Sequence, residues 1–288
     1  MTAIALLHPD VPPKTVERFR AGHAEIQIQE NLAKATNCSA VLIFGGDGTV
    51  HRHLPDLQKL EVPILVVPCG SGNDFAKAMG LRNPEIALQA WRDFCAHGSN
   101  VREIDLGAIQ PCNQNFQEEA LFCCVAGIGM DAEANARANR LPQWLKRRGG
   151  YLLSALRALI AFKATEMRVI SEAADFSRPA FLVAVANAHR YGGGVKIAPR
   201  AAPNDGLLDV CFVSRMHKLK LLCWLPTIFF GGHLRLREVE YFQARQIRID
   251  AARPLGVYAD GDYVCHTPVA IRVIPKALRV IVPARISL

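Results

Sequence analysis

Residues 41–50 read Val41-Leu42-Ile43-Phe44-Gly45-Gly46-Asp47-Gly48-Thr49-Val50, and this stretch decides the fold. An apolar run that stops at turn residues is typical of a buried strand. The glycines at its end allow positive φ and let a ligand approach the backbone, because they carry no Cβ. Thr49 is then placed to cap a helix that continues from Val50. A strand, a glycine turn and a helix N-terminus favour a phosphate site, although a plain turn explains the same residues.

A second segment repeats this pattern. Residues 62–67 form another apolar run, and small polar residues follow it as Pro68-Cys69-Gly70-Ser71-Gly72-Asn73-Asp74. A short helix is expected from Phe75. Ligands of open α/β sheets bind at the carboxyl ends of the strands, so the two loops are interpreted as the two walls of one phosphate crevice.

Strands and helices alternate up to about residue 106. Further strands are expected at 3–7, 25–29 and 101–109, and helices at 14–20 and 85–96. The helix after Val50 is predicted to end after about two turns, because Pro55 removes a backbone donor. This alternation indicates an α/β domain with a parallel sheet at residues 1–106.

Beyond residue 106 the pattern changes to strands separated by turns. Strands are expected at 121–126, 166–171, 180–186, 207–213, 239–249 and 269–273, with helices at 132–138 and 144–162. Such spacing favours an antiparallel β-sandwich. The second domain is therefore placed at residues 107–275.

The composition favours an anionic partner and a reducing compartment. The chain of 288 residues has a formal net charge of +8, and 7% of its residues are aromatic. Basic and aromatic residues do not interleave as in base-stacking proteins, so nucleic acid is not expected as a partner. Nine cysteines without a Cys-x-x-Cys pair argue against disulfides and a zinc site. No apolar run is long enough to span a bilayer, so a cytoplasmic location is expected, with peripheral membrane contact left open.

Three further glycine turns carry polar groups. Asn187 precedes the triple glycine at 192–194, and Asn204-Asp205-Gly206 forms a second turn. A carboxylate in a tight turn is able to hold a hard cation together with backbone carbonyls. The third turn, Asp260-Gly261-Asp262, brings two carboxylates together, which suits a metal ligand or a general base. A plain hairpin turn is the alternative in each case.

Six motifs along the chain point to one family. They are Gly-Gly-Asp-Gly-Thr at 45–49, Pro-Cys-Gly-Ser-Gly-Asn-Asp-Phe-Ala-Lys at 68–77, Gly-Ile-Gly-Met-Asp at 127–131, Tyr-Gly-Gly-Gly with Ala-Pro at 191–199, Asn-Asp-Gly-Leu-Leu-Asp at 204–209 and Asp-Gly-Asp at 260–262. In this order they resemble the diacylglycerol kinase catalytic family, which includes soluble bacterial lipid kinases and the sphingosine and ceramide kinases. The resemblance covers nearly the whole chain. It implies an α/β N-terminal domain like that of NAD kinases and diacylglycerol kinases, a β-sandwich C-terminal domain, and a last strand that returns residues 276–288 to the first domain.

The resemblance also implies an activity and the residues that carry it. The expected reaction is ATP- and Mg²⁺-dependent transfer of the γ-phosphoryl group to a lipid hydroxyl, with diacylglycerol as the acceptor and phosphatidic acid as the product. Asp260 resembles the catalytic base and Asp47 the essential aspartate of the first loop. Asp205 resembles the ligand of a structural Mg²⁺, together with carbonyls of Ala202 and Leu207. The residues that resemble nucleotide contacts are Gly45, Gly46, Asp47, Gly48, Thr49, Val50, His51, Ser71 and Asp262.

A lipid substrate at a membrane surface is the expected partner besides ATP. Residues 134–150 contain several Lys and Arg and no acid, and residues 218–230 combine basic with apolar side chains. Such segments suit an anionic lipid surface, and a solvated face with a helix that covers the sandwich is the alternative. The oligomeric state is open, and a homodimer is one option.

Two other functions stay open. A kinase of a soluble acceptor such as NAD shares Gly-Gly-Asp-Gly, but the second loop, Gly-Ser-Gly-Asn-Asp-Phe-Ala, resembles that of the lipid kinases. A weakly active or non-catalytic nucleotide- and membrane-binding relative is the other, because the first strand ends in His8-Pro9-Asp10 where the family usually has Asn-Pro-x-Ser-Gly.

Overall fold

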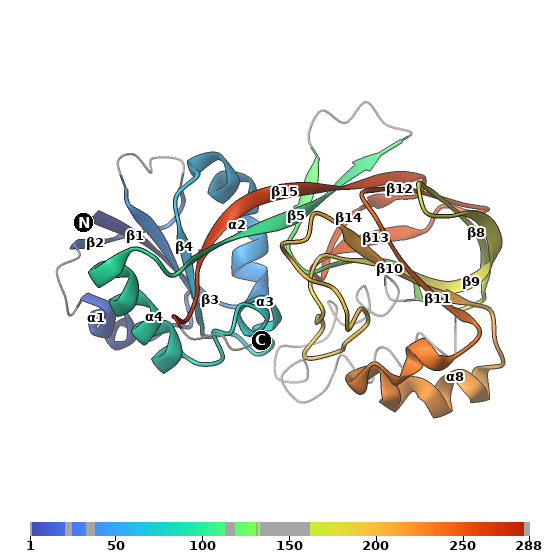
Figure 1. Ribbon diagram of the computed structural model, residues 1–288, viewed down its shortest axis with the longest axis horizontal. Coiled ribbons are helices and arrows are strands. Elements are labelled where there is room, and N and C mark those ends of the chain that lie inside the picture. The colour runs from blue at the N-terminus through green and yellow to red at the C-terminus, as the bar shows by residue number, and fades with distance from the viewer. Residues whose placement is uncertain are drawn as a thin grey trace. The chain divides into compact units, whose positions relative to one another are not determined.

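The chain folds into two compact units. The computed structural model describes residues 2–20, 25–32, 38–112, 119–130, 132 and 162–284. The first unit combines Met1–Leu106 with Pro275–Leu288, and the second spans Gly107–Ile274 (Figure 1). In the described part of the chain, no helix has the length and apolar character that crossing a membrane requires.

The first unit is built on a parallel sheet. Its strands lie in the order β15-β4-β3-β1-β2, and β3 (Ala40–Gly45) pairs in parallel with both of its neighbours. Every residue of β3 is buried, as expected for a strand covered on both faces. The other strands of this sheet are β1 (Thr2–Leu7), β2 (Glu25–Gln29), β4 (Ile64–Pro68) and the end of β15 (Val269–Ile281).

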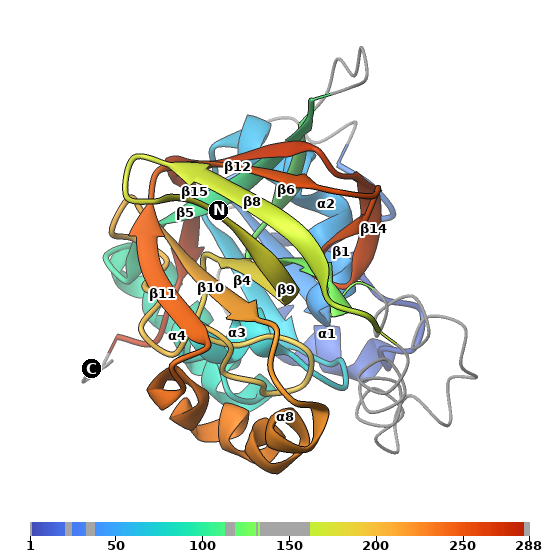
Figure 2. The ribbon, with the colours of Figure 1, turned by 90° about the vertical axis from the view of Figure 1, so that its right-hand side faces the viewer.

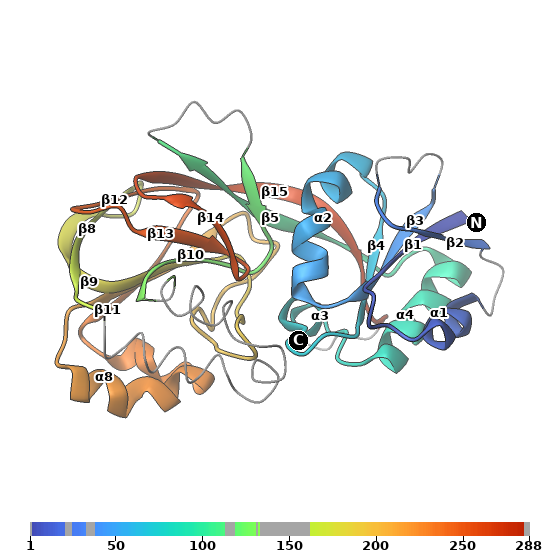
Figure 3. The same ribbon diagram turned by 180° about the vertical axis from the view of Figure 1, so that it is seen from behind.

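Helices cover both faces of this sheet. The ring of Phe19 on α1 (Pro13–Arg20) packs edge-on against Phe44 of β3, with centroids 5.0 Å apart. Trp91 on α4 (Pro84–His97) donates to the Phe19 carbonyl at 3.3 Å, so α1 and α4 share one face. The connection from β1 to β2 and the connection from β3 to β4 run toward opposite edges of the sheet. Because such connections are right-handed, their helices lie on opposite faces. Helix α2 (Asp47–Leu60) therefore covers the other face, as Figures 1 and 3 show.

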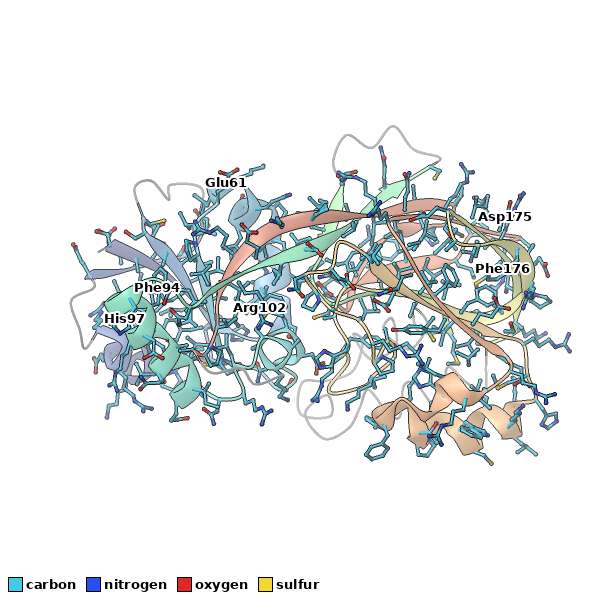
Figure 4. The ribbon with its side chains drawn as sticks, viewed as in Figure 1. Glu61, Phe94, His97, Arg102, Asp175 and Phe176 are labelled. Atoms are coloured by element: carbon cyan, nitrogen blue, oxygen red, sulfur yellow. The ribbon has the colours of Figure 1, made fainter. Side chains whose placement is uncertain are left out.

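The prediction that Pro55 ends the helix after the first loop is wrong. Helix α2 continues through Pro55 to Leu60, and Glu61, labelled in Figure 4, is its C-cap. The φ of Glu61 is 53°, which is left-handed. Leu54 and Leu57 are buried on either side of the proline. Their packing against the unit outweighs the one backbone hydrogen bond that the proline removes, because tertiary burial overrides local propensity.

The second unit is an antiparallel sandwich in which one strand belongs to both layers. The first half of β9 (Asp175–Ala186) pairs with β8 (Thr165–Ser171), and its second half pairs with β7 and β10 (Figure 2). Phe176 on β9, labelled in Figure 4, packs edge-on against Phe212, and their ring centroids are 4.9 Å apart. The remaining strands are the second half of β5 (Val101–Pro111), and β6 (Ala120–Phe122), β7 (Val125–Gly129), β10 (Leu208–Ser214), β11 (Val239–Ala244), β12 (Gln246–Ala251), β13 (Gly256–Ala259) and β14 (Asp262–His266).

Three predicted strands differ from the observed ones. The strand expected at 121–126 is divided into β6 and β7 at Cys123 and Cys124, whose backbone amides bond to a side chain instead of a neighbouring strand. The strand expected at 239–249 is divided at Arg245. The strand expected at 269–273 continues to Ile281 as β15, which accommodates a left-handed residue at Lys276. The helices expected at 132–138 and 144–162 lie almost entirely outside the described residues.

Three short helices follow β10. They are α8 (Lys218–Trp224), the 3₁₀ helix η2 (Leu225–Phe230) and the 3₁₀ helix η3 (Gly232–Arg235). Figure 2 shows this segment below the strands of the second unit, beside the start of β11.

Close packing in the sandwich predicts that Gly107→Ala is strongly destabilising. A Cβ at this position would lie 2.0 Å from the Cζ atom of Phe122, which is fully buried on the neighbouring strand β6. We expect a loss of about 2–3 kcal/mol of unfolding free energy, measured by urea denaturation. In a Phe122→Leu background the same glycine substitution should cost clearly less, and an equal cost in both backgrounds would contradict this account.

Candidate functional site

The two glycine loops of the sequence lie side by side in the first unit. Gly45 at the end of β3 pairs in parallel with Pro68 at the end of β4, and the Cys69 amide donates to the Gly45 carbonyl at 2.9 Å. The expectation that these loops occupy neighbouring strand ends is confirmed. The amide of His8, at the end of β1, bonds to the Phe44 carbonyl at 2.9 Å, so the first-strand turn lies at the same edge.

The backbones of the two loops touch at a pair of glycines. A Cβ on Gly70 would lie 2.6 Å from the Cα of Gly46, so neither position has room for a side chain. Asn73, at a left-handed φ of 56°, fixes the second loop because its side chain accepts from the Gly70 amide at 2.9 Å and donates to the Gly70 carbonyl at 2.6 Å. The loops therefore form one continuous backbone surface.

Asp47 joins the two loops through its side chain. It is the first residue of α2, and its two carboxylate oxygens accept from the amides of Asp74 and Phe75, each at 3.0 Å. These amides start the short helix α3 (Asp74–Ala78), so Asp47 caps a helix that lies 27 residues further along the chain. Its direct role in this structure is to position the second loop.

The other predicted contacts of this unit divide into buried and accessible residues. Gly48 and Ser71 are exposed, and Gly46 and His51 are half-buried. Val50 is fully buried, and Thr49 is nearly so, lying against Gly45. The prediction that Thr49 caps the helix is wrong: Gly46, in an extended conformation, is the N-cap, and its carbonyl accepts from the Thr49 and Val50 amides.

Asp260 lies in the tight turn of the hairpin formed by β13 and β14. Its carboxylate accepts from the amides of Cys123 and Cys124, both at 2.8 Å, and from the amide of Val125 at 3.0 Å. The Cys123 thiol also lies 3.3 Å from the Oδ2 atom of Asp260. A carboxylate offers about four acceptor positions, and these four donors fill them.

The two carboxylates of this turn have different surroundings. Asp260 has a left-handed φ of 49° and faces the break between β6 and β7, which is where its carboxylate holds the two cysteine amides. Asp262 starts β14 and is exposed. The structure thus contains the hairpin, and the geometry of its turn places the half-buried carboxylate of Asp260 against three backbone amides.

Asp205 lies in a second polar cluster of the same unit. Its Oδ1 atom accepts from the Leu207 amide at 3.0 Å, and its Oδ2 atom accepts from Gln243, which also donates to Asp209. Burial raises the pKa of Asp209, and the charge of Asp205 adds to this shift. The Tyr241 hydroxyl offsets part of this cost by donating to Asp209 at 2.7 Å.

This cluster fits a hard cation. Carboxylate oxygens and backbone carbonyls are the ligands that Mg²⁺ and Ca²⁺ prefer, and Asp205 stands in an exposed turn flanked by Ala202 and Leu207. The repulsion that raises the pKa of Asp209 would also fall if a cation bound at Asp205.

Sequence reasoning missed the partners that hold the acids in place. The amides of Cys123 and Cys124 lie more than a hundred residues from Asp260 in sequence, at separations of 137 and 136 residues. Asn187, buried, supports this break by donating to the Cys123 carbonyl at 3.1 Å. Asp131 and the basic residues of the segment 134–150 lie outside the described residues.

Two family models cover most of the chain. The model described as the diacylglycerol kinase catalytic domain matches residues 5–109. The model described as the YegS C-terminal NAD kinase beta sandwich-like domain matches residues 124–282. The two matches follow one another along the chain.

Individual proteins agree with these matches. A diacylglycerol kinase of Mycobacterium tuberculosis is 35% identical over 259 residues, which cover 88% of this chain and 79% of the relative. A solved diacylglycerol kinase structure from Bacillus anthracis has a TM-score of 0.69 at 18% identity and covers 98% of this chain and 97% of its own. An NAD kinase from Archaeoglobus fulgidus, solved in complex with ATP, has a TM-score of 0.58 at 16% identity and covers 99% and 94%. At such identities the structural likeness concerns the fold.

An α/β domain with glycine loops at its strand ends, followed by a β-sandwich like that of NAD kinases, defines a class of kinases. The predicted fold class is thereby confirmed. Within this class the chain belongs to the diacylglycerol kinase catalytic-domain family, whose named members include diacylglycerol kinases and YegS-like lipid kinases.

The capping role of Asp47 predicts that its removal destabilises the first unit. In Asp47→Ala the amides of Asp74 and Phe75 lose their acceptors, so we expect a loss of about 1–3 kcal/mol in urea denaturation. Asp47→Asn keeps one acceptor oxygen and should lose less. Asp56→Ala, on the same helix, is the matched control and should change stability by under about 0.5 kcal/mol. Equal stability of Asp47→Ala and the wild type would show that Asp47 does not hold the second loop.

Proposed function

We propose that this protein is an ATP- and Mg²⁺-dependent lipid kinase that phosphorylates diacylglycerol to phosphatidic acid. The observation that carries the proposal is the pair of glycine loops whose backbones touch at Gly46 and Gly70 at the strand ends of a kinase fold. The 35% identity to a diacylglycerol kinase supports the choice of acceptor. The first unit then binds the nucleotide, and the second unit carries the groups for the lipid and the metal.

The nucleotide is proposed to bind along the first loop. Phosphates bind at a helix N-terminus because the first backbone amides lack acceptors within the helix, and Gly48 leaves that end of α2 open. Ser71, exposed in the second loop, and His51, half-buried on α2, add polar groups. Gly45, Thr49 and Val50 contribute by shaping the loop, since their side-chain positions are filled or buried.

Mg²⁺ is proposed to bind at the turn of Asp205, with the carbonyls of Ala202 and Leu207. When bound, a divalent cation supplies positive charge that offsets the repulsion of nearby carboxylates and phosphates. Asp205 is held for this role by its bonds to the Leu207 amide and to Gln243. Asp262, exposed at the start of β14, is proposed as a further group for nucleotide or metal.

Asp260 is proposed to accept the proton of the acceptor hydroxyl. The lipid oxygen would form the new bond to the γ-phosphorus, the bond to the β-γ bridging oxygen would break, and the hydroxyl proton would move to Asp260. Three amides orient this carboxylate, and the Cys123 thiol occupies one of its acceptor positions. A thiol is the weakest of these donors, so it is the one that a substrate hydroxyl would displace.

An NAD kinase is the second candidate function. A solved NAD kinase shares the fold, with a TM-score of 0.58. Its support is confined to the fold, whereas the lipid kinase relatives match in sequence as well. A comparison of phosphate transfer to NAD and to lipid therefore separates the two.

The activity is tested with radiolabelled ATP and Mg²⁺ on diacylglycerol in mixed micelles, with NAD as the alternative acceptor. We expect labelled phosphatidic acid and no labelled product from NAD. Asp260→Asn should lower kcat by about a hundredfold or more, because general-base catalysis typically contributes that much. Labelled NADP without labelled lipid would overturn the lipid kinase proposal.

Substitutions of Cys123 test whether Asp260 is a general base or has only a structural role. Cys123→Ser replaces the thiol by a stronger donor to Asp260, and Cys123→Ala removes the donor, while the fold should tolerate both small residues. If Asp260 is the base, kcat should fall about tenfold in the serine variant and stay near wild type in the alanine variant. Equal kcat in both, at equal thermal stability, would contradict the base role.

The proposed metal site predicts a stabilising effect of Mg²⁺. At about tenfold its Kd, Mg²⁺ should add about 1.4 kcal/mol of stability and raise Tm by about 3 °C. Asp205→Asn should abolish this shift, and Asp175→Asn, which removes an exposed acid elsewhere in the same unit, should keep it. A shift that survives in Asp205→Asn would place the metal elsewhere.

A further inference from the structure

An apolar face is exposed on the helical segment after β10. It consists of Leu219 and Leu222 of α8 and Phe229 and Phe230 of η2, which are 65%, 44%, 37% and 84% exposed. We call these four residues the docking face. They are four of the six large hydrophobic side chains that are strongly exposed in the described part of the chain, and they fall within twelve residues. Single exposed apolar residues are common, but such a concentration marks an interaction surface.

The segment is not a helix that covers the sandwich. Only Leu221 of α8 is buried, and none of the residues of η2 is. The apolar side chains of the docking face therefore contribute little to the core of the second unit. The alternative that the sequence left open, a helix that covers the sandwich, therefore does not hold for these four residues.

The fold holds this segment in place from several sides. The Lys196 amide donates to the Ile228 carbonyl at 3.2 Å, and the buried His233 ring bonds to the Ile197 carbonyl at 2.9 Å. Lys220 pairs with Glu238 at 2.7 Å. Figure 1 shows α8 outside the strands of the second unit. The docking face is thus presented by a fixed scaffold.

The charge around the docking face is mainly positive, with Glu238 as an acid beside it. Residues 215–237 contain five Lys and Arg side chains and no Asp or Glu. Four of the five are exposed, and the fifth, Lys220, is half-buried and pairs with Glu238. The five basic residues are Arg215, Lys218, Lys220, Arg235 and Arg237.

We propose that this face docks on an anionic lipid surface. Apolar side chains enter the boundary between headgroups and acyl chains, and a surrounding set of basic side chains attracts anionic headgroups. Lipid satisfies both features at once. A second copy of the chain, joined through the same face, would bring two mainly basic sets of side chains together, with Glu238 as the acid beside each set, which disfavours a homodimer at this place.

This docking face deepens the proposed function, and it rests on that function only for the reason to approach a membrane. A kinase whose acceptor stays in a bilayer has to reach that bilayer from water. The two proposals fail separately, because vesicle binding needs neither ATP nor turnover, and phosphorylation of a dispersed short-chain diacylglycerol needs no vesicle.

The test measures co-flotation of the full chain with vesicles, without ATP. We expect binding to phosphatidylcholine vesicles that contain about one third phosphatidylglycerol, and weak binding to pure phosphatidylcholine. Phe230→Ser and Leu219→Ser should each lower the partition coefficient about tenfold or more, because each removes a large apolar side chain from the interface. Ile28→Ser, which removes an apolar side chain 51% exposed on β2, is the matched control and should bind as wild type.

Charge variants test the second feature. Arg235→Glu and Arg237→Glu together should weaken binding to the anionic vesicles about fivefold or more per side chain, and added salt should act in the same direction. Lys59→Glu and Arg82→Glu, both exposed in the first unit, serve as the matched charge control.

Thermal unfolding and kinase activity on dispersed short-chain diacylglycerol should be unchanged in Phe230→Ser.

Two results would overturn the docking proposal. One is wild-type vesicle binding by Phe230→Ser and Leu219→Ser. The other is a wild-type dimer, seen in sedimentation, that Phe230→Ser converts to a monomer while vesicle binding is absent in both. That second outcome would assign the face to a copy of the chain. If the wild type does not phosphorylate the dispersed short-chain diacylglycerol, that result counts against the proposed function instead.

Discussion

The structure depends on carboxylates that organise backbone amides from distant parts of the chain. Asp47 holds the two amides that start α3, and Asp260 holds the three amides at the break between β6 and β7. Both loops have irregular backbones whose donors no strand or helix satisfies. A buried amide without an acceptor costs about 1–3 kcal/mol, so each acid is a structural requirement of its own unit before any chemistry is considered.

This constraint changes how the acids of a glycine loop are interpreted. An essential aspartate is readily taken for a group that touches the substrate. In the first unit, however, both oxygens of Asp47 are used by the second loop, while the open end of α2 is formed by Gly48. The contact of Gly46 with Gly70 requires the loops to be close, and Asp47 makes that closeness stable. Loss of activity on substitution of Asp47 would therefore reflect a displaced loop as much as lost chemistry.

Much of the fold was predictable because local pattern and burial agree in this chain. The alternation of apolar runs and glycine turns gave the parallel sheet, and β1, β2, β3, α1 and α4 lie close to their predicted bounds. Pro55 misled because local propensity was given more weight than the burial of Leu54 and Leu57. The division at Cys123 was unpredictable, because the carboxylate that causes it is 137 residues away. Long-range polar contacts leave no local signature, whereas periodicity does.

The burial of residues 218–230 in the second unit also could not be predicted from their own sequence. The sequence of residues 218–230 fits a helix that covers the core and equally a helix that is exposed, because each kind of helix has one apolar face. Burial decides between them, and burial depends on whether the sandwich is already filled by its own strands. Here β9 supplies buried Val183, and β10 supplies buried Val210 and Phe212, so the core is complete without the residues of η2. An apolar segment that the core does not need, in a stretch without acids, requires a different environment, and an anionic lipid surface supplies both the apolar phase and the opposite charge.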